Sequence, residues 1–194
     1  MKSARKNDRG FSLLELCVVV AILMILGAIS MISAVSVVQG IRLQESATNY
    51  ANLLQQARMR AVRDNRIYTV QTTTTTPLNA FFDLGLGGTN PTIVFAKGVT
   101  PMPFGSGPGL TNLENQFLPV GQEWTVNTTS PQPTFGPRGL PCKLNAGNCP
   151  SMVPASYVTF LQNSESTKWK AITVNPAARI RIWSYDGTTW SPMN

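Results

Sequence analysis

A single carboxylate at the head of a long apolar segment is the residue most clearly placed for chemistry. Glu15 is followed by a run without any charged residue, 16–38. An ionised carboxylate that enters hydrocarbon is costly unless it is paired. A free α-amino group at a chain terminus would be a suitable partner if it lay at a similar depth. The sequence therefore predicts that Glu15 needs a partner, which a free amine could supply.

Two cysteines near the C-terminal end could form a covalent link. Cys142 and Cys149 lie in a Pro- and Gly-rich stretch, whereas Cys17 lies inside the apolar run. In an oxidising compartment the first two would pair, and closing this short loop would contribute about 2 to 3 kcal/mol. The alternative is two free thiols. No CxxC pair and no histidine accompanies them, so no metal site is predicted.

A basic and aromatic pattern occurs just before the C-terminus. Arg179, Arg181 and Trp183 alternate there with two isoleucines, Ile180 and Ile182. Alternate residues of a β-strand share a face, so two guanidinium groups and an indole would lie together. Such a face could contact the phosphates and bases of a nucleic acid. The alternative is an amphipathic strand whose isoleucines enter the core, with its other face solvated or packed under the cysteine loop.

Residues for catalysis are sparse. The chain has no histidine, which removes the commonest general base and the commonest transition-metal ligand. Its acidic residues are scattered without the spacing of a calcium loop or a catalytic pair. No phosphate-binding loop or nucleophile elbow is present. We therefore predict no catalytic residues and no cofactor, and a chain that is not an enzyme.

The element that must position Glu15 is a membrane helix. At 1.5 Å per residue, residues 16–38 would extend about 34 Å, enough to cross a bilayer once. Basic residues concentrate before this run, whereas Arg42 alone follows it closely. By the positive-inside rule the N-terminus is then cytoplasmic and the C-terminal domain lies outside. The basic residues of the leader are Lys2, Arg5, Lys6 and Arg9.

The opening of this helix carries a recognisable motif. After the basic leader comes Gly10, and Phe11 begins the sequence FSLLEL, in which Glu15 is the fifth residue. This arrangement resembles the processing site of type IV pilins and pseudopilins. The resemblance implies that a prepilin peptidase cleaves between Gly10 and Phe11 and that Phe11 becomes N-methylated. It also implies that Glu15 pairs with the N-terminal amine of a neighbouring pilin subunit during assembly.

The remaining chain shows one more helical segment and then strands. Residues 39–65 contain no proline and place apolar side chains three and four apart, which predicts an amphipathic continuation of the helix whose stripe needs a sheet to cover it. Loops are predicted at 98–109 and 130–154. Strands of one antiparallel sheet system are predicted at 67–73, 80–84, 92–96, 124–127, 156–161, 169–174 and 179–185.

Three later segments carry a narrower resemblance. The helix end 53–62 (LLQQARMRAV), together with 135–139 (FGPRG) and 177–182 (AARIRI), resembles the GspH/FimT group of minor pilins. The resemblance implies an α+β, type IV pilin-like fold: a long N-terminal hydrophobic helix packed at its C-terminal half on an antiparallel β-sheet domain. The expected parts are a leader at 1–10, a transmembrane and filament-core helix at 11–38, an amphipathic continuation at 39–66 and a periplasmic β-rich domain at 67–194.

That group implies two roles. One is a minor subunit of a type II secretion pseudopilus or a type IV pilus, made in the bacterial inner membrane and transferred into the filament. The alternative is DNA uptake, because DNA-capturing members carry a Gly-Arg-x-Arg pattern near the C-terminus. Here Ala178 replaces the glycine, while Arg179 and Arg181 are retained. DNA is therefore an additional expected partner under the alternative only.

Overall fold

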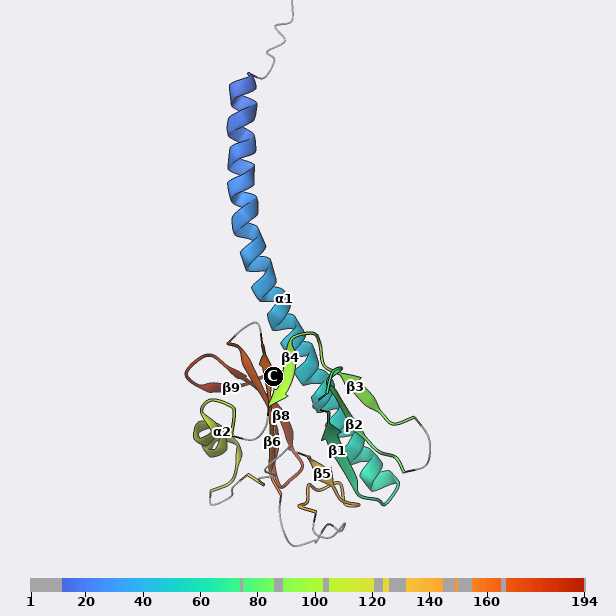
Figure 1. Cartoon of the computed structure of the whole chain (residues 1–194). Coiled ribbons are helices and arrows are strands. Elements are labelled where there is room, and N and C mark those ends of the chain that lie inside the picture. Colours follow the sequence, from blue (N-terminus) through green and yellow to red (C-terminus); the bar gives the residue numbers. More distant parts are fainter. Residues whose placement is uncertain are drawn as a thin grey trace, which may run out of the picture. The chain divides into compact units, whose positions relative to one another are not determined.

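One helix, α1 (Leu13–Arg63), accounts for the first third of the chain (Figure 1). No proline interrupts it. The basic residues in its last turn, Arg60 and Arg63, stabilise the helix because cations interact favourably with the negative end of its dipole. The helix ends at Arg63, and Asn65 just beyond it adopts the left-handed conformation at φ 49°. The N–H of Arg66 then bonds the carbonyl of Ala61 at 3.2 Å, the hydrogen bond of a Schellman cap.

The computed structural model describes residues 12–73, 75–85, 89–102, 105–120, 124–125, 132–144, 149, 155–164 and 167–193. Within α1, the side chains of residues 28–34 lie outside this description. The chain divides into two units, Met1–Val38 and Gln39–Asn194, which are taken separately below.

Two antiparallel sheets make up the β part of the second unit (Figure 1). Among the described residues, the smaller sheet has the order β3-β2-β1-β5 and the larger sheet the order β4-β6-β7-β8-β9. A short helix, α2 (Leu110–Phe117), lies between β4 and β5 in the chain. The strands are β1 (Tyr68–Thr72), β2 (Asn79–Phe82), β3 (Thr92–Val94), β4 (Val99–Met102), β5 (Thr134–Phe135), β6 (Tyr157–Asn163), β7 (Trp169–Val174), β8 (Ile180–Tyr185) and β9 (Trp190–Pro192).

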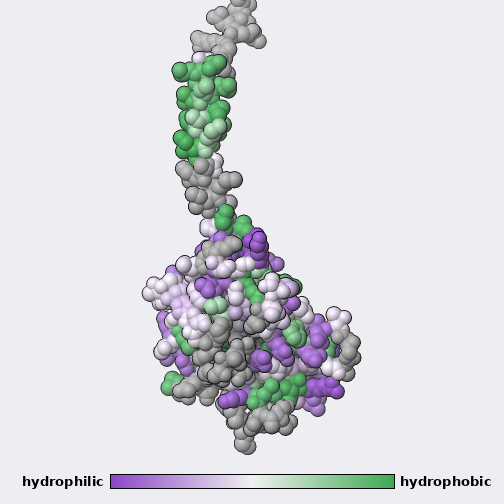
Figure 2. Space-filling model, viewed as in Figure 1, coloured by the Kyte–Doolittle hydropathy of each residue, from purple (hydrophilic) through white to green (hydrophobic). Residues whose placement is uncertain are grey.

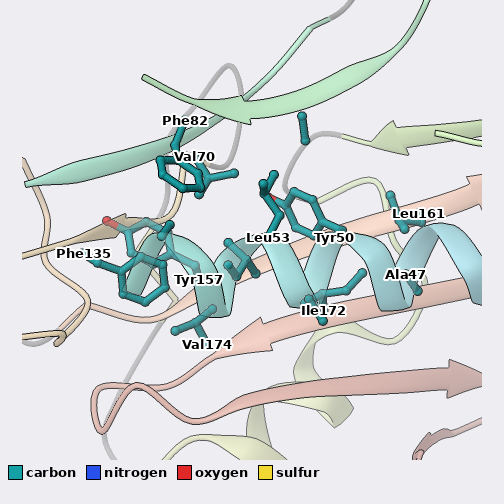
Figure 3. Close-up of a cluster of buried hydrophobic side chains, with 14 of the residues drawn as sticks. Ala47, Tyr50, Leu53, Val70, Phe82, Phe135, Tyr157, Leu161, Ile172 and Val174 are labelled. Atoms are coloured by element: carbon teal, nitrogen blue, oxygen red, sulfur yellow. The ribbon is translucent and has the colours of Figure 1, made fainter. Parts of the chain in front are cut away.

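The main core lies around the second half of α1, which packs against both sheets (Figure 3). Tyr50 of α1 is fully buried, and its hydroxyl shares a hydrogen bond of 3.2 Å with Thr159 of β6. Phe82 contributes from the smaller sheet and Ile172 from the larger one. Small helix residues such as Ala47 and Ala57 let the backbones approach closely. Sheets cover α1 on two sides here, and most of its buried residues from Leu43 to Ala61 are apolar.

A second core lies on the opposite face of the larger sheet, under α2. Leu113 and Phe117 of α2 are buried there against Phe160 of β6 and Trp183 of β8. The rings of Phe117 and Trp183 meet edge to face, with centroids 5.8 Å apart. The larger sheet is therefore apolar on both faces, with α1 on one side and α2 on the other.

The structure confirms the predicted fold class and most of the predicted elements. The strand predicted at 169–174 has the observed bounds of β7, and five others overlap observed strands. The strand predicted at 124–127 is wrong at its described residues, because Trp124 and Thr125 are not in a strand. The loop predictions missed β4 and β5, and neither α2 nor β9 was predicted. Two sheets form instead of one sheet system.

Candidate functional site: the head of α1 and the arginine surface

Glu15 lies in the first turn of α1 and is exposed. The helix begins at once after Ser12, whose carbonyl accepts the N–H of Leu16 at 3.1 Å. A carboxylate in the first turn stabilises the helix, because it interacts favourably with the positive end of the helix dipole. Gly10 and Phe11, the predicted cleavage and methylation residues, lie outside the described residues.

The described side chains around Glu15 are apolar and uncovered. Leu14 is 74% exposed and Leu16 is 59% exposed. On the face that Figure 2 shows, hydrophobic side chains cover this first part of the helix. Such an exposed apolar helix surface requires apolar surroundings. The exposed large hydrophobic residues between Leu13 and Leu26 are Leu13, Leu14, Leu16, Val18, Val19, Val20, Ile22, Leu23, Met24, Ile25 and Leu26.

Among the residues whose side chains are described, no helix is both long and apolar enough to cross a membrane. The predicted span 16–38 includes residues 28–34, whose side chains are outside the described part. The membrane helix therefore stays a prediction.

Cys142 and Cys149 form the predicted disulfide, with their Cα atoms 5.5 Å apart. The N–H of Cys142 bonds the carbonyl of Thr134 at 3.0 Å, which holds the loop against β5. The hydroxyl of Tyr157 donates to the Cys142 carbonyl oxygen, and burial raises the pKa of Tyr157 to about 12. Gly136 lies beside the bridge, with its missing Cβ position 3.5 Å from Cys149 Cβ. The bridge therefore lies beside Tyr157 and β5, next to the core around α1.

The aromatic residue of the predicted nucleic-acid face is buried. Trp183 is 1% exposed, and its indole N–H donates to Thr173 Oγ1 at 2.9 Å. The prediction that Trp183 stacks on a base is therefore wrong, because α2 covers this face of β8. Arg179 is exposed and Arg181 half-buried.

The structure brings other arginines to this region that the sequence pattern did not reveal. Arg58 of α1 donates from Nη1 to the carbonyl of Ala178 at 3.1 Å, next to Arg179. The same side chain lies against Gly139, whose missing Cβ position is 3.5 Å from Arg58 Cγ, next to the exposed Arg138. Three segments that are far apart in the sequence thus place arginines around the C-terminal end of α1. We call Arg58, Arg138 and Arg179 the arginine surface.

Two family models match the chain. The prokaryotic N-terminal methylation motif matches residues 5–31, and the type II transport protein GspH matches residues 46–178. The second match covers roughly two thirds of the 194 residues. The chain belongs to the GspH family. Searches of the curated proteins and of the solved structures gave no match.

The family match confirms the resemblance drawn from the sequence. This GspH-family chain is a type IV pilin-like protein of the GspH/FimT group, with the α+β fold described above. GspH pseudopilins are structural subunits rather than enzymes, and the two matches support a minor pilin or pseudopilin role. The GspH match ends at Ala178, so the Arg179 and Arg181 pair lies beyond it. Glu15 lies within the methylation motif.

Proposed function

We propose that the chain is a minor pseudopilin of a type II secretion system, anchored in the bacterial inner membrane by residues 11–38 before assembly. One observation carries the proposal: the described start of α1 exposes apolar side chains, and Glu15 is the one charged residue in 13–38. Lipid would cover this surface before assembly and neighbouring helices would cover it afterwards. The family name favours the secretion pseudopilus over the type IV pilus.

The proposed maturation begins with removal of the leader. A prepilin peptidase cleaves between Gly10 and Phe11, and Phe11 is methylated at its new α-amino group. The methylation-motif match across residues 5–31 supports this step. Intact mass and N-terminal sequencing of the protein from membranes, with and without the peptidase, test it. We expect a chain that begins at methylated Phe11 only when the peptidase is present; a chain that begins at Met1 in both hosts would contradict the step.

The proposed assembly step pairs Glu15 with the α-amino group of a neighbouring subunit. A carboxylate in apolar surroundings is costly when unpaired, so a partner amine favours the assembled state over the isolated one. Glu15→Ala should therefore leave membrane insertion intact and lower the amount of subunit in the filament about tenfold. Cross-linking to neighbouring subunits in sheared filaments measures this amount.

Glu45→Ala is the matched control, because Glu45 is exposed, lies on the same helix and carries the same charge. It should be incorporated normally. Equal incorporation of the Glu15→Ala and Glu45→Ala proteins would contradict the assembly step.

A second candidate function is DNA binding, favoured by the convergence of the arginine surface. The exposed Arg138 and Arg179 could contact phosphates, although this is a small footprint beside the contacts of a strong binder. Band-shift assays would compare wild type with the Arg138→Ala and Arg179→Ala variants. DNA binding predicts weaker affinity and a flatter salt dependence, with Lys97→Ala unchanged because Lys97 is exposed between β3 and β4, away from the helix end. Binding that is equal in all four proteins would contradict this candidate.

A further inference from the structure

The strand β3 forms an open edge of the smaller sheet (Figure 1). It pairs with β2 on one side and has no neighbour on the other among the described strands. Its three residues, Thr92, Ile93 and Val94, are all β-branched, and such residues favour an extended conformation. Thr92 is exposed, and Val94 is 62% exposed. The strand is therefore accessible, and no function described above uses it.

Two hydrogen bonds show which backbone groups of this segment face β2. The carbonyl of Pro91 accepts an N–H of β2 at 3.4 Å, and the N–H of Phe95 donates to the carbonyl just before β2 at 3.0 Å. Because inward and outward residues alternate along an antiparallel strand, Ile93 also faces β2. The N–H and carbonyl groups of Thr92 and Val94 therefore point away from the sheet. Within the described residues, no hydrogen bond uses these four groups.

The other edges of the two described sheets are protected against further pairing. β4 contains Pro101 and β9 contains Pro192, and proline has no N–H to donate. Segment 140–142 covers β5, because the N–H of Cys142 donates to a β5 carbonyl at 3.0 Å. Pro91 does not protect β3, since its nitrogen faces β2 as its carbonyl does. Proteins usually guard exposed edges with proline, charge or a covering segment, so the edge of β3 is a candidate pairing site.

The shortness of β3 limits what backbone pairing alone can contribute. A hydrogen bond to a partner replaces one to water, so its net gain is small. A second contact is available where the strand ends, because a hollow of about 410 Å³ adjoins it there. Phe95 and Ala96, which follow β3, line this hollow together with Pro77 and Leu78. Lys97 is the one charged residue among its described lining residues.

Lys97 gives this hollow a positive charge without a counter-ion. The residue is exposed. The ion pair found within the described part of the chain joins Arg63 and Asp64, so no described carboxylate lies at ion-pair distance from Lys97. An exposed ammonium group attracts an acidic partner and disfavours a basic one, which adds specificity more than affinity. The partner of this edge should therefore carry a carboxylate.

We propose that β3 binds an extended acidic segment of another protein, which adds to the smaller sheet as an antiparallel strand. Main-chain hydrogen bonds to Thr92 and Val94 would hold the segment, as in other cases of strand addition. An antiparallel strand begins where β3 ends, so the acidic residue would stand at its N-terminal end, beside Lys97. Small β-branched side chains would follow at alternate positions, next to the exposed Val94. The proposal goes beyond the pseudopilin role and does not depend on membrane anchoring.

The peptide acetyl-DTVTVT, labelled with fluorescein at its C-terminus, is the probe. Its binding to the full chain in neutral detergent micelles would be followed by fluorescence anisotropy. In the proposed register its third and fifth residues lie opposite Val94 and Thr92, so their N–H groups donate to β3. N-methylation of these two residues should weaken binding at least about tenfold, whereas N-methylation of the fourth and sixth should change it by less than about threefold.

Substitutions in β3 test the same contacts from the side of the protein. Val94→Pro removes an outward N–H, which the sheet does not use, and should weaken binding at least about tenfold. Val94→Thr keeps the N–H and a branched side chain and should bind like wild type. If the Val94→Pro protein does not fold, the two N-methylated peptides still decide the question.

A charge exchange tests the role of Lys97. Lys97→Glu should weaken binding of the acidic peptide about tenfold, and replacing the aspartate of the peptide by lysine should restore it. Lys143→Glu is the matched control, because Lys143 is also exposed and undergoes the same reversal of charge elsewhere. It should bind the acidic peptide like wild type. Equal weakening by both reversals would indicate nonspecific attraction and would contradict the proposal.

Hydrogen exchange at single residues locates the bound peptide. Saturating peptide should slow exchange of the Thr92 and Val94 amides at least about fivefold and leave the amide of the exposed Val120 unchanged. No binding at millimolar peptide, equal binding of the two N-methylated peptides, or unchanged exchange at β3 would each overturn the proposal. A chain that is not membrane-anchored would still show the predicted binding, so failure of the pseudopilin role is distinguishable from failure of this site.

Discussion

Arg58 and Ala178 are joined by a hydrogen bond of 3.1 Å from the guanidinium Nη1 to the backbone carbonyl oxygen, across 120 residues of sequence. Arg58 lies near the end of α1, and Ala178 lies in the turn between β7 and β8. The bond fixes a helix end against a hairpin turn. It also determines where Arg179, the next residue, lies relative to the helix.

Removing this guanidinium should destabilise the second unit. Arg58→Ala leaves the half-buried contact without its donor, and we expect the free energy of unfolding to fall by about 1 to 2 kcal/mol. Chemical denaturation of the full chain in micelles, followed by tryptophan fluorescence, measures the change. Arg66→Ala removes the same charge from an exposed position and should have almost no effect. Equal effects of the two substitutions would show that the Ala178 contact contributes nothing.

The turn that receives Arg58 has an unusual residue at its tightest point. Ala178 is fully buried and adopts φ 60°, a conformation that favours glycine. Its N–H bonds the carbonyl of Asn175 at 2.8 Å, as in a type I turn, and the left-handed residue then completes a bulged hairpin.

Two substitutions at this position should therefore differ in their effect. Ala178→Gly should change stability by less than about 1 kcal/mol, because relief of backbone strain offsets the lost methyl group and the freer unfolded chain. Ala178→Val should cost at least about 2 kcal/mol, because a β-branched residue is strained at positive φ and the site has no room. Denaturation midpoints compare the two. A valine variant as stable as the glycine variant would contradict the left-handed turn.

Tyr50 should make the fold sensitive to alkaline pH. Burial raises the pKa of Tyr50 to about 12, whereas a tyrosine in an unfolded chain titrates near 10. The stabilisation from the neutral phenol is therefore fully present below about pH 10 and is lost as the pH rises through about 12. The Tyr50→Phe protein has no phenol to ionise, so it does not lose stability in this pH range. It leaves the Thr159 hydroxyl without its hydrogen-bond partner, which lowers the free energy of unfolding by about 1 kcal/mol.

The stability difference between the two proteins should consequently change sign with pH. Tyr50→Phe should be the less stable protein at pH 7 and the more stable one above about pH 11, where the wild type has lost about 1.4 kcal/mol. Denaturation curves from pH 7 to 12 measure this, and Tyr157 titrates in both proteins alike. Thr159→Val breaks the same hydrogen bond but retains the phenol, so it should keep the alkaline loss. A difference that is constant over this pH range would contradict the raised pKa.

Reduction of the Cys142–Cys149 bridge should destabilise the second unit moderately. The closed loop is short, with a sequence separation of 7, so the chain-entropy contribution is about 2.5 kcal/mol. Dithiothreitol should lower the unfolding free energy of the wild type by about that amount and leave Cys142→Ser/Cys149→Ser unaffected. Cys17→Ser should respond to the reductant like the wild type, since Cys17 is a free cysteine. A wild type indifferent to the reductant would contradict a stabilising bridge.

The sequence was most informative where side-chain periodicity is strong and the partners are near. The three- and four-residue spacing after residue 38 predicted the buried stripe of α1, and Ala47, Tyr50 and Ala57 are indeed buried. The same pattern included Ile41 and Val62, which are 60% and 53% exposed. These two lie at the ends of the stripe. Periodicity identifies a face of the helix but not where the sheets begin and end over it.

The missed elements depend on contacts that a local pattern does not encode. β4 contains Pro101, which argues against a strand, yet β4 lies at the edge of its sheet, where proline is tolerated. α2 begins after Gly109 without a side-chain cap and is stabilised by its burial against the larger sheet. For the same reason, alternation placed Arg181 and Trp183 on one face, but could not reveal that α2 covers the tryptophan.

The second half of α1 is synthesised well before the strands that cover it. Tyr50 leaves the ribosome 109 residues before Thr159, the residue it bonds. At 5 to 20 residues per second, this delay lasts about 5 to 20 s. During that interval the apolar stripe of α1 has no sheet to cover it. Under the proposed export, a chaperone or the membrane surface would therefore shield the helix until the last strands arrive.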